Sequence, residues 1–444
     1  MSGSASLPAG PVTHRSVLAI AAPMTLAHLT TPLLGLVATT VVGRLGDAAA
    51  LGGVALGAVV FDFLFWGFGF LRMGTVGLAA QAMGRGDALE QRAVLARALL
   101  LAFACGGAMV LLQWPIGRLA RHLAGASPAA DAALATYYGV RIWAAPVSLA
   151  NYALLGWFTG LGRTGHALAL QAGINGINIA LCVLFVLGLD RGVEGAAEAA
   201  LWAEAAGTLA GLLLCARLLG FRLEVPRAVV TDRARLMEMF ALNRDIMIRT
   251  AALLAAFAFF AAQGARAGDV TLAANALLNT MVLLSVYFLD GFATAAEQLC
   301  GAASGARDRT AFSTALRLVL GWGYGFAVPA VAFFLLAGPT ILGLMSTNGE
   351  VVAEAVRYLP FAALLPLFGV AAYAYDGGYV GALWSRDMRN LMLAALAFYL
   401  ATWWALRPFG NAGLWSALLL FLAARGVLQA WRLPALVRRT FAEG

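Results

Sequence analysis

The sequence contains little charge and few of the side chains on which catalysis or metal binding depends. Charged residues make up 12% of its 444 residues, all 30 basic residues are arginine, and only four histidines and four cysteines occur. The cysteines (Cys105, Cys182, Cys215 and Cys300) are scattered through apolar segments, and no pair has the spacing of a metal site or a redox motif. We therefore expect buried free thiols, no bound cofactor and no enzymatic activity, because no nucleophile–base pair or metal cluster is recognisable.

The sequence is instead rich in apolar residues. Hydrophobic residues make up 62% of the chain and the mean hydropathy is +0.83, more than a soluble domain of this length needs. Apolar runs of about 20 residues or more, at regular spacing, predict helices that cross a membrane. The sequence predicts an all-α polytopic membrane protein with about twelve transmembrane helices, at roughly 17–43, 51–82, 94–116, 130–161, 166–188, 195–219, 240–265, 270–302, 313–337, 353–382, 389–406 and 411–433.

The arginines predict how the chain is oriented in the membrane. The net charge of +8 would suggest a nucleic-acid partner in a soluble protein, but here most arginines fall in the loops of one side. The positive-inside rule places that side in the cytoplasm with both termini, which agrees with an even number of helices. We expect an integral protein of a bacterial inner membrane, surrounded by the lipid bilayer, without a cleavable signal peptide and without nucleic acid.

The two halves of the chain share landmarks at a constant offset of 221 residues. The matching pairs are Tyr152 and Tyr373, Gly156 and Gly377, Gly160 and Gly381, Gly84 and Gly305, and Gly192 and Gly413. Such a repeat predicts an old duplication, with an amino lobe of six helices at 1–222 and a carboxyl lobe of six helices at 240–444. A polar cytoplasmic linker at 223–239 joins them. Repeats that enter the membrane in the same direction leave a natural path for a substrate at their interface.

Acidic residues inside the predicted helices are the main candidates for function, because a charge at mid-membrane costs about 2.5–3.5 kcal/mol on insertion scales. The candidates for proton or cation coupling are Asp62, Glu198, Glu204, Asp290 and Asp376. Cationic residues that could pair with Asp290 or Asp376 lie elsewhere in the sequence. We therefore expect both to be unpaired at midspan, and Asp376 or Asp290 to bind the driving cation or a cationic substrate.

Polar and aromatic residues in the same helices are candidates for substrate binding. Asn175 and Asn178 share one helix face with Cys182, and Glu297 shares a face with Asp290. Trp66 and Tyr373 complete the aromatic candidates. Each of these side chains could equally serve helix packing or face lipid. Asp245 and Arg249, four residues apart, are predicted to form an ion pair with each other.

Four segments together resemble a known transporter family. They are PLLGLVATTVVGRLG (32–46), FLRMG (70–74), ALNRDIMIR (241–249) and LDGFA (289–293). These segments resemble the multidrug and toxic compound extrusion (MATE) family, and more narrowly its DNA-damage-inducible (DinF) branch. The resemblance covers essentially the whole chain. It implies two six-helix lobes arranged as a V, alternating access driven by a proton or sodium gradient, and export of amphipathic, often cationic, organic compounds.

The sequence departs from that family where coupling is concerned. The family usually carries an aspartate directly after Gly-Leu-Val in its first helix, held to be the proton-binding group, and this chain has Ala38 there. An aspartate that usually follows the asparagines of the fifth helix is replaced by Cys182, whose thiol is a weaker acid than a carboxyl group. Ala38 is therefore counted among the candidates for substrate contact, not for coupling.

Three mechanisms stay open after this loss. The coupling carboxylate could have moved within the amino lobe to Asp62, Glu198 or Glu204. It could lie in the carboxyl lobe, where Asp376 matches an aspartate that resembles the family's sodium-site residue. The chain could also bind substrate without active coupling.

We expect a monomeric secondary exporter with a small organic substrate and a proton or sodium ion as coupling cation. Two alternatives remain. One is a coupling-deficient binding or receptor protein. The other is a flippase for an amphipathic metabolite or a lipid-linked substrate.

Overall fold

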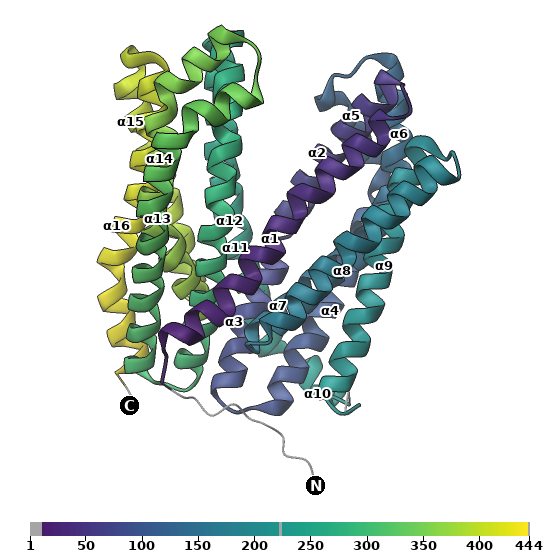
Figure 1. Ribbon diagram of the computed structural model, residues 1–444. Helices are drawn as coiled ribbons and strands as arrows, with labels where there is room; N and C mark the ends of the chain where they lie inside the picture. The colour runs from purple at the N-terminus through teal and green to yellow at the C-terminus, as the bar shows by residue number, and fades with distance from the viewer. Residues whose placement is uncertain (1–10, 222–223, 443–444) are drawn as a thin grey trace. The chain divides into compact units, whose positions relative to one another are not determined.

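The computed structural model describes residues 11–221 and 224–442, and every regular element within them is a helix (Figure 1). Nine helical segments of this part are long and apolar enough to cross a membrane. Three further crossings bring the number to twelve. One is α1 (His14–Gly43), and one is formed by α6 (Pro128–Arg141) together with α7 (Ala145–Gly160). The third arises because one of the nine segments contains two helices, α15 (Ser385–Leu406) and α16 (Gly410–Phe441). The predicted all-α architecture of about twelve membrane helices is confirmed.

The chain forms two compact units. The N-terminal unit comprises Leu26–Ala79 and Asp87–Phe240, and the C-terminal unit comprises Met1–Thr25, Ala80–Gly86 and Ala241–Gly444, as far as these ranges are described. The predicted lobes kept the start of α1 and the end of α3 with the amino half, whereas in the structure these two segments pack with the carboxyl half.

The predicted linker at 223–239 is partly helical. Residue 223 lies outside the described residues. The short helix α10 (Arg227–Val230) and the first turns of α11 (Arg233–Arg266) occupy most of the rest, so the helix expected to begin near 240 begins at Arg233.

The N-terminal unit is built from paired helices. α4 packs on α7, α8 on α9, and α2 on α6. Asp47 caps α2 by accepting hydrogen bonds from the backbone N–H groups of Ala49 and Ala50, and Pro128 opens α6, where its missing N–H is not needed. Besides α6, α7 and α10, the helices are α2 (Ala48–Gly67), most of α3 (Phe70–Gly84), α4 (Ala88–Leu111), α5 (Gln113–Ala124), η1 (Ile142–Ala144), α8 (Thr164–Val183), the π-helical turn η2 (Leu184–Gly188) and α9 (Gly192–Leu218).

The C-terminal unit packs α12 and α13 against α14, and α16 against both α14 and α15 (Figure 1). Its core contains a reciprocally hydrogen-bonded polar pair. Asn275 and Asn411 donate to each other's side-chain oxygens at 2.9 and 3.0 Å, and Trp415 Nε1 donates to Asn275 Oδ1 at 2.9 Å. The additional helices here are α12 (Asp269–Gly305), α13 (Arg309–Met345), α14 (Gly349–Gly381) and η3 (Arg407–Phe409).

Helix boundaries repeat at the offset that the sequence predicts. α3 ends at Gly84 and α12 at Gly305; α7 ends at Gly160 and α14 at Gly381. α4 begins at Ala88 and α13 at Arg309; α8 begins at Thr164 and α15 at Ser385. Even the caps correspond, because Asp87 and Asp308 accept hydrogen bonds from the backbone at the starts of α4 and α13. Each of these pairs is 221 residues apart, so the predicted duplication is confirmed.

The ends of α3 and α12 cross in a reciprocal way within the C-terminal unit. A Cβ atom added to Gly84 would lie 2.0 Å from the carbonyl oxygen of Ala302, and one added to Gly305 would lie 2.2 Å from that of Gln81. Residues 81 and 84 correspond to residues 302 and 305 at the same offset, so the contact has local twofold symmetry. Only glycine permits so close an approach of two helix backbones.

Candidate functional site

In the N-terminal unit, Glu204 forms the centre of a polar cluster, which we call the Glu204 cluster (Arg141, Asn151, Glu204 and Thr208). Asn151 Nδ2 on α7 donates to Glu204 Oε2 at 2.7 Å and to the Glu204 carbonyl oxygen at 3.0 Å. Thr208, one turn further along α9, donates to Asn151 Oδ1 at 3.1 Å. Glu204 is therefore oriented by neutral partners, and its side chain keeps 19% of its surface exposed.

Arg141, at the end of α6, connects this cluster with α2. Its Nη2 lies 3.6 Å from Glu204 Oε1, and its guanidinium carbon lies 5.6 and 5.3 Å from the ring centres of Phe61 and Phe65. Asp62, between those two phenylalanines in sequence, is exposed and lies within electrostatic range of the same arginine. The structure thus brings two of the predicted carboxylates, Asp62 and Glu204, to one cation.

Glu198 lies apart from the Glu204 cluster in its contacts. It forms an ion pair with Arg191, which also lies 3.6 Å from Glu194, near the start of α9. Because the same arginine serves two acids at a helix end, this group resembles a structural charge cluster more closely than a carrier site.

The remaining candidates of the N-terminal unit occupy α1, α2 and α8. Asn175 donates to Thr30 Oγ1 at 2.6 Å and accepts from Gln171 at 3.2 Å, so it links α8 to α1. Asn178 is buried on α8, and Ala38 is half-buried on α1. Trp66 on α2 is 52% exposed, one turn from Asp62.

In the C-terminal unit, Asp376 is surrounded by cations, and the expectation that it is unpaired was wrong. Its Oδ2 accepts from Arg249 on α11 and from Arg425 Nη2 on α16 at 2.6 Å, and its Oδ1 accepts from Gln429 Nε2 at 2.5 Å. Asp376 is 3% exposed and Arg425 is 1% exposed. We call these four residues the Asp376 cluster.

The predicted ion pair between Asp245 and Arg249 was also wrong. Asp245 Oδ1 accepts from Arg389 at 2.7 Å and its Oδ2 from Ser385 at 3.2 Å, while Arg249 turns to Asp376. Arg244, the neighbouring residue, also donates to Asp245 Oδ1, at 3.2 Å. Arg389 and Ser385 are on α15, far away in sequence, and their hydrogen-bond geometry outweighs the helical four-residue spacing.

The other candidates of the C-terminal unit lie around this cluster. Tyr373 is buried on α14, and the guanidinium carbon of Arg425 lies 5.7 Å from its ring centre. Asp290 on α12 is half-buried and lies within electrostatic range of Arg249 and Tyr373. Glu297, two turns further along α12, is buried. The structure therefore groups Asp290 and Tyr373 with Asp376.

The two clusters share two equivalent positions of the repeat, and at one of them the charge is reversed. Glu204 and Thr208 on α9 correspond, 221 residues on, to Arg425 and Gln429 on α16. The duplicated position on the last helix of each half is thus an acid in the N-terminal unit and a cation in the C-terminal unit. A carboxylate that gains or loses a proton is available only in the first case, since an arginine keeps its charge.

Sequence reasoning missed Arg141 and Arg425 and assigned Arg249 to the wrong acid, Asp245. Arg425 lies in the middle of a predicted membrane helix, and Arg249 lies ten residues into another. The cost of a charge at that depth was the signal that could have identified them as partners of buried acids. Among the described residues no group of three histidine, cysteine or acidic side chains is arranged to hold a metal ion.

Comparisons with known proteins identify the family. The profile of the MatE family matches residues 23–184 and 246–402. The chain is 39% identical over 416 residues to DNA damage-inducible protein F of Escherichia coli (strain K12), which covers 93% of this chain and 91% of that protein. It is 27% identical to the "Probable multidrug resistance protein NorM" of Rhizobium meliloti (strain 1021), over 97% of this chain and 95% of the relative.

Solved structures show the same fold. A crystal structure of MATE in the bent conformation superposes with a TM-score of 0.85 at 20% identity, covering 96% of each chain. An outward-facing multidrug resistance MATE family transporter of the MOP superfamily gives a TM-score of 0.85 at 19% identity, over 98% of this chain and 99% of that one. With the family profile and the similarity to DNA damage-inducible protein F, these findings show that the chain belongs to the MatE family of membrane transporters.

Proposed function

We propose that this transporter exports amphipathic, often cationic, organic compounds in exchange for protons or sodium ions, by alternating access. The names of its relatives support a multidrug substrate range. The exposed Trp66 and Asp62 of the N-terminal unit, with Phe61 and Phe65 behind them, offer an aromatic surface beside a carboxylate. That combination suits a cation with an apolar body.

The observation that carries the proposal is the difference between the two clusters. Asp376 is buried and held by two arginines and a glutamine, so removing its charge would take away the carboxylate that both guanidinium groups contact, with Asp290 left in electrostatic range of Arg249. Glu204 has a single arginine at 3.6 Å and keeps part of its surface exposed, and Asp62 is exposed. We therefore place the coupling carboxylate in the N-terminal unit, at Glu204 or Asp62, and give Asp376 a structural role.

Arg141 gives this pair a simple exchange mechanism. When either acid takes up a proton or a sodium ion, the guanidinium group turns toward the other acid, and a cationic substrate competes for the site that is released. The membrane potential contributes about 2.3 kcal/mol for each charge moved across 100 mV. Exchange of one coupling cation for one monovalent cationic substrate moves no net charge, so the concentration gradient of the coupling ion drives it. The potential adds to export only where the cycle carries net charge inward, as with a second coupling ion.

The test is efflux of a cationic dye from proteoliposomes, with proton and sodium gradients imposed separately. We expect Glu204→Gln or Asp62→Asn to abolish gradient-driven efflux while the protein still binds the dye. Glu238→Gln is the matched control, because Glu238 is an exposed acid paired with Arg235 at 3.3 Å. If both carboxamide variants export at the parental rate, coupling does not reside in this unit.

The cellular setting is part of the same proposal. We place the protein as a monomer in a bacterial inner membrane with both termini in the cytoplasm, on the arginine distribution. If the parental protein binds dye but neither gradient drives efflux, the receptor or flippase alternatives replace the exporter.

A further inference from the structure

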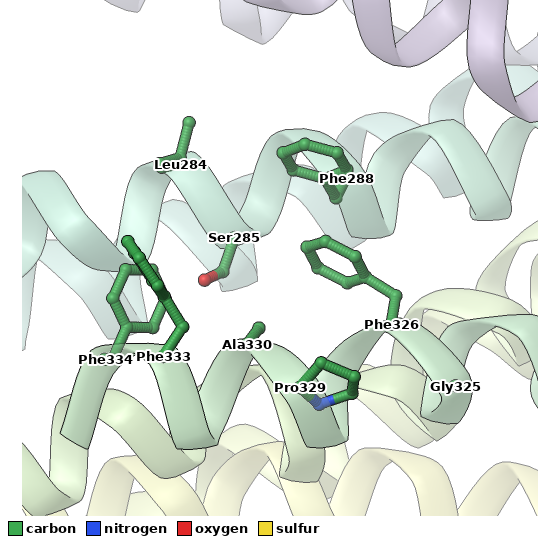
Figure 2. Close-up of a pocket in the computed structure, with 9 residues that line it drawn as sticks. All are labelled: Leu284, Ser285, Phe288, Gly325, Phe326, Pro329, Ala330, Phe333 and Phe334. Carbon is green, nitrogen blue, oxygen red and sulfur yellow. The ribbon is translucent and has the colours of Figure 1, made fainter. Parts of the chain in front are cut away.

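An apolar cavity lies between α12 and α13 of the C-terminal unit. Its volume is about 390 Å³, and its lining comes from residues 284–288 of α12 and 325–334 of α13 (Figure 2). Leu284, Pro329 and Phe333 are exposed at its open side. A cavity of this size is within the range of small-molecule sites.

The cavity wall is aromatic. Phe288 and Phe326 stack with ring centres 4.4 Å apart and planes at 16°, and Phe333 and Phe334 form a second pair at 5.6 Å. Figure 2 shows the two pairs at opposite ends of the cavity, with Ala330 between them. Aromatic rings at both ends favour a ligand with rings over a flexible acyl chain.

One polar side chain points into this apolar space. Ser285 is 1% exposed, and its Oγ has no hydrogen-bond partner among the described residues. Figure 2 shows the hydroxyl directed into the cavity. Thr280 and Thr294 on the same helix donate to the carbonyl one turn back, at 3.2 and 2.8 Å, so Ser285 departs from the local pattern.

Pro329 interrupts the backbone hydrogen bonding of α13 beside the cavity. Pro329 has no amide hydrogen, so the helix cannot donate in the usual way to the carbonyl of Gly325, four residues earlier. Gly325 lines the cavity and has no side chain to cover that oxygen. No charged residue is among the lining residues. The described lining therefore offers one side-chain hydroxyl and no partner for an ionic group.

We propose that this cavity binds a neutral aromatic molecule with one hydrogen-bonding group, which Ser285 Oγ recognises. The inference deepens the proposed function by adding a neutral class of cargo, and it rests on that function only for the step from binding to export. The rings of the ligand lie against the two phenylalanine pairs, and its polar atom meets the hydroxyl. A cationic substrate is directed to the N-terminal unit instead.

Benzophenone is a suitable probe, because it is neutral, has two rings and one carbonyl acceptor, and cross-links to nearby C–H bonds under ultraviolet light. Purified full-length protein in lipid nanodiscs is irradiated, and the labelled peptides are mapped by mass spectrometry. We expect labelling within 284–288 and 325–334, competition by 1-naphthol, and about tenfold weaker labelling by (4-benzoylbenzyl)trimethylammonium. This readout needs no gradient, so it can succeed or fail independently of transport.

Two variants test the assignment to Ser285. Ser285→Ala removes the donor and should raise the benzophenone concentration for half-saturation of labelling by about tenfold. Ala330→Phe should abolish the labelling by filling the cavity. Ser313→Ala, an exposed serine of α13, is the control and should leave labelling unchanged. The proposal is overturned if labelling spreads over exposed lipid-facing positions such as Leu336 and Leu344, or if neither variant changes it.

Discussion

The Asp376 cluster gives the sharpest prediction of a structural role. Asp376→Asn keeps the shape of the side chain but removes the only negative charge that contacts Arg249 and Arg425 within the cluster. Breaking a buried ion pair by removing one partner destabilises a protein by about 3–5 kcal/mol, because the other charge stays buried. At roughly 2 °C or more per kcal/mol for a unit of this size, the midpoint of thermal unfolding should fall by at least about 6 °C.

The protein carries a built-in reporter for this measurement. Cys182, Cys215 and Cys300 are buried, so a thiol-reactive fluorescent dye reports unfolding as they become accessible. Asp387→Asn is the matched control, because Asp387 makes one half-exposed pair with Arg432 at 2.8 Å. Loss of that pair should change stability by less than about 1 kcal/mol.

A double variant tests whether the loss of stability comes from the unbalanced charge of the arginines. Arg425→Gln added to Asp376→Asn removes one of the uncompensated cations, so the double variant should regain part of the lost stability. The expected fall in the unfolding midpoint is about 6 °C or more. The reasoning fails if the midpoint of Asp376→Asn lies within about 2 °C of that of the parent. It also fails if that variant loses only transport, because Asp376 would then be a carrier.

Three further predictions concern other parts of the chain. Gly305→Val should greatly reduce the yield of folded protein on size-exclusion chromatography, since its Cβ would meet a backbone oxygen of α3 at 2.2 Å; Gly321→Val, with nothing within 4 Å, should not. Asn275→Ala should destabilise by about 1–3 kcal/mol in the dye assay, because the side chain of Asn411 loses its buried partner; an unchanged midpoint would contradict this. Ala38→Asp restores the carboxylate that relatives carry in the first helix, so it should raise the dependence of efflux on a proton gradient. No change would mean that the residues around position 38 no longer form a proton site.

Glycine, proline and apolar residues alone determined much of the architecture. The apolar runs predicted the membrane helices, because in lipid a spanning segment must satisfy its backbone groups by itself. The recurrence of Gly84 as Gly305 and of Gly160 as Gly381 predicted the duplication, since these positions end helices in both halves. Local sequence was sufficient to predict the helices and the repeat, whereas the reason for glycine at 84 and 305 is a tertiary contact, the close crossing of two helix backbones.

The pairing of charges was decided by the tertiary structure. Asp376 looked unpaired in sequence because Arg249 lies 127 residues before it and Arg425 lies 49 after it. The same holds for Asn151 and Glu204, which are 53 residues apart. Sequence identified which residues were too polar for their helices, but only helix packing decided which of them meet. Coulomb attraction acts across space, and neither helical period nor composition records which faces the fold brings together.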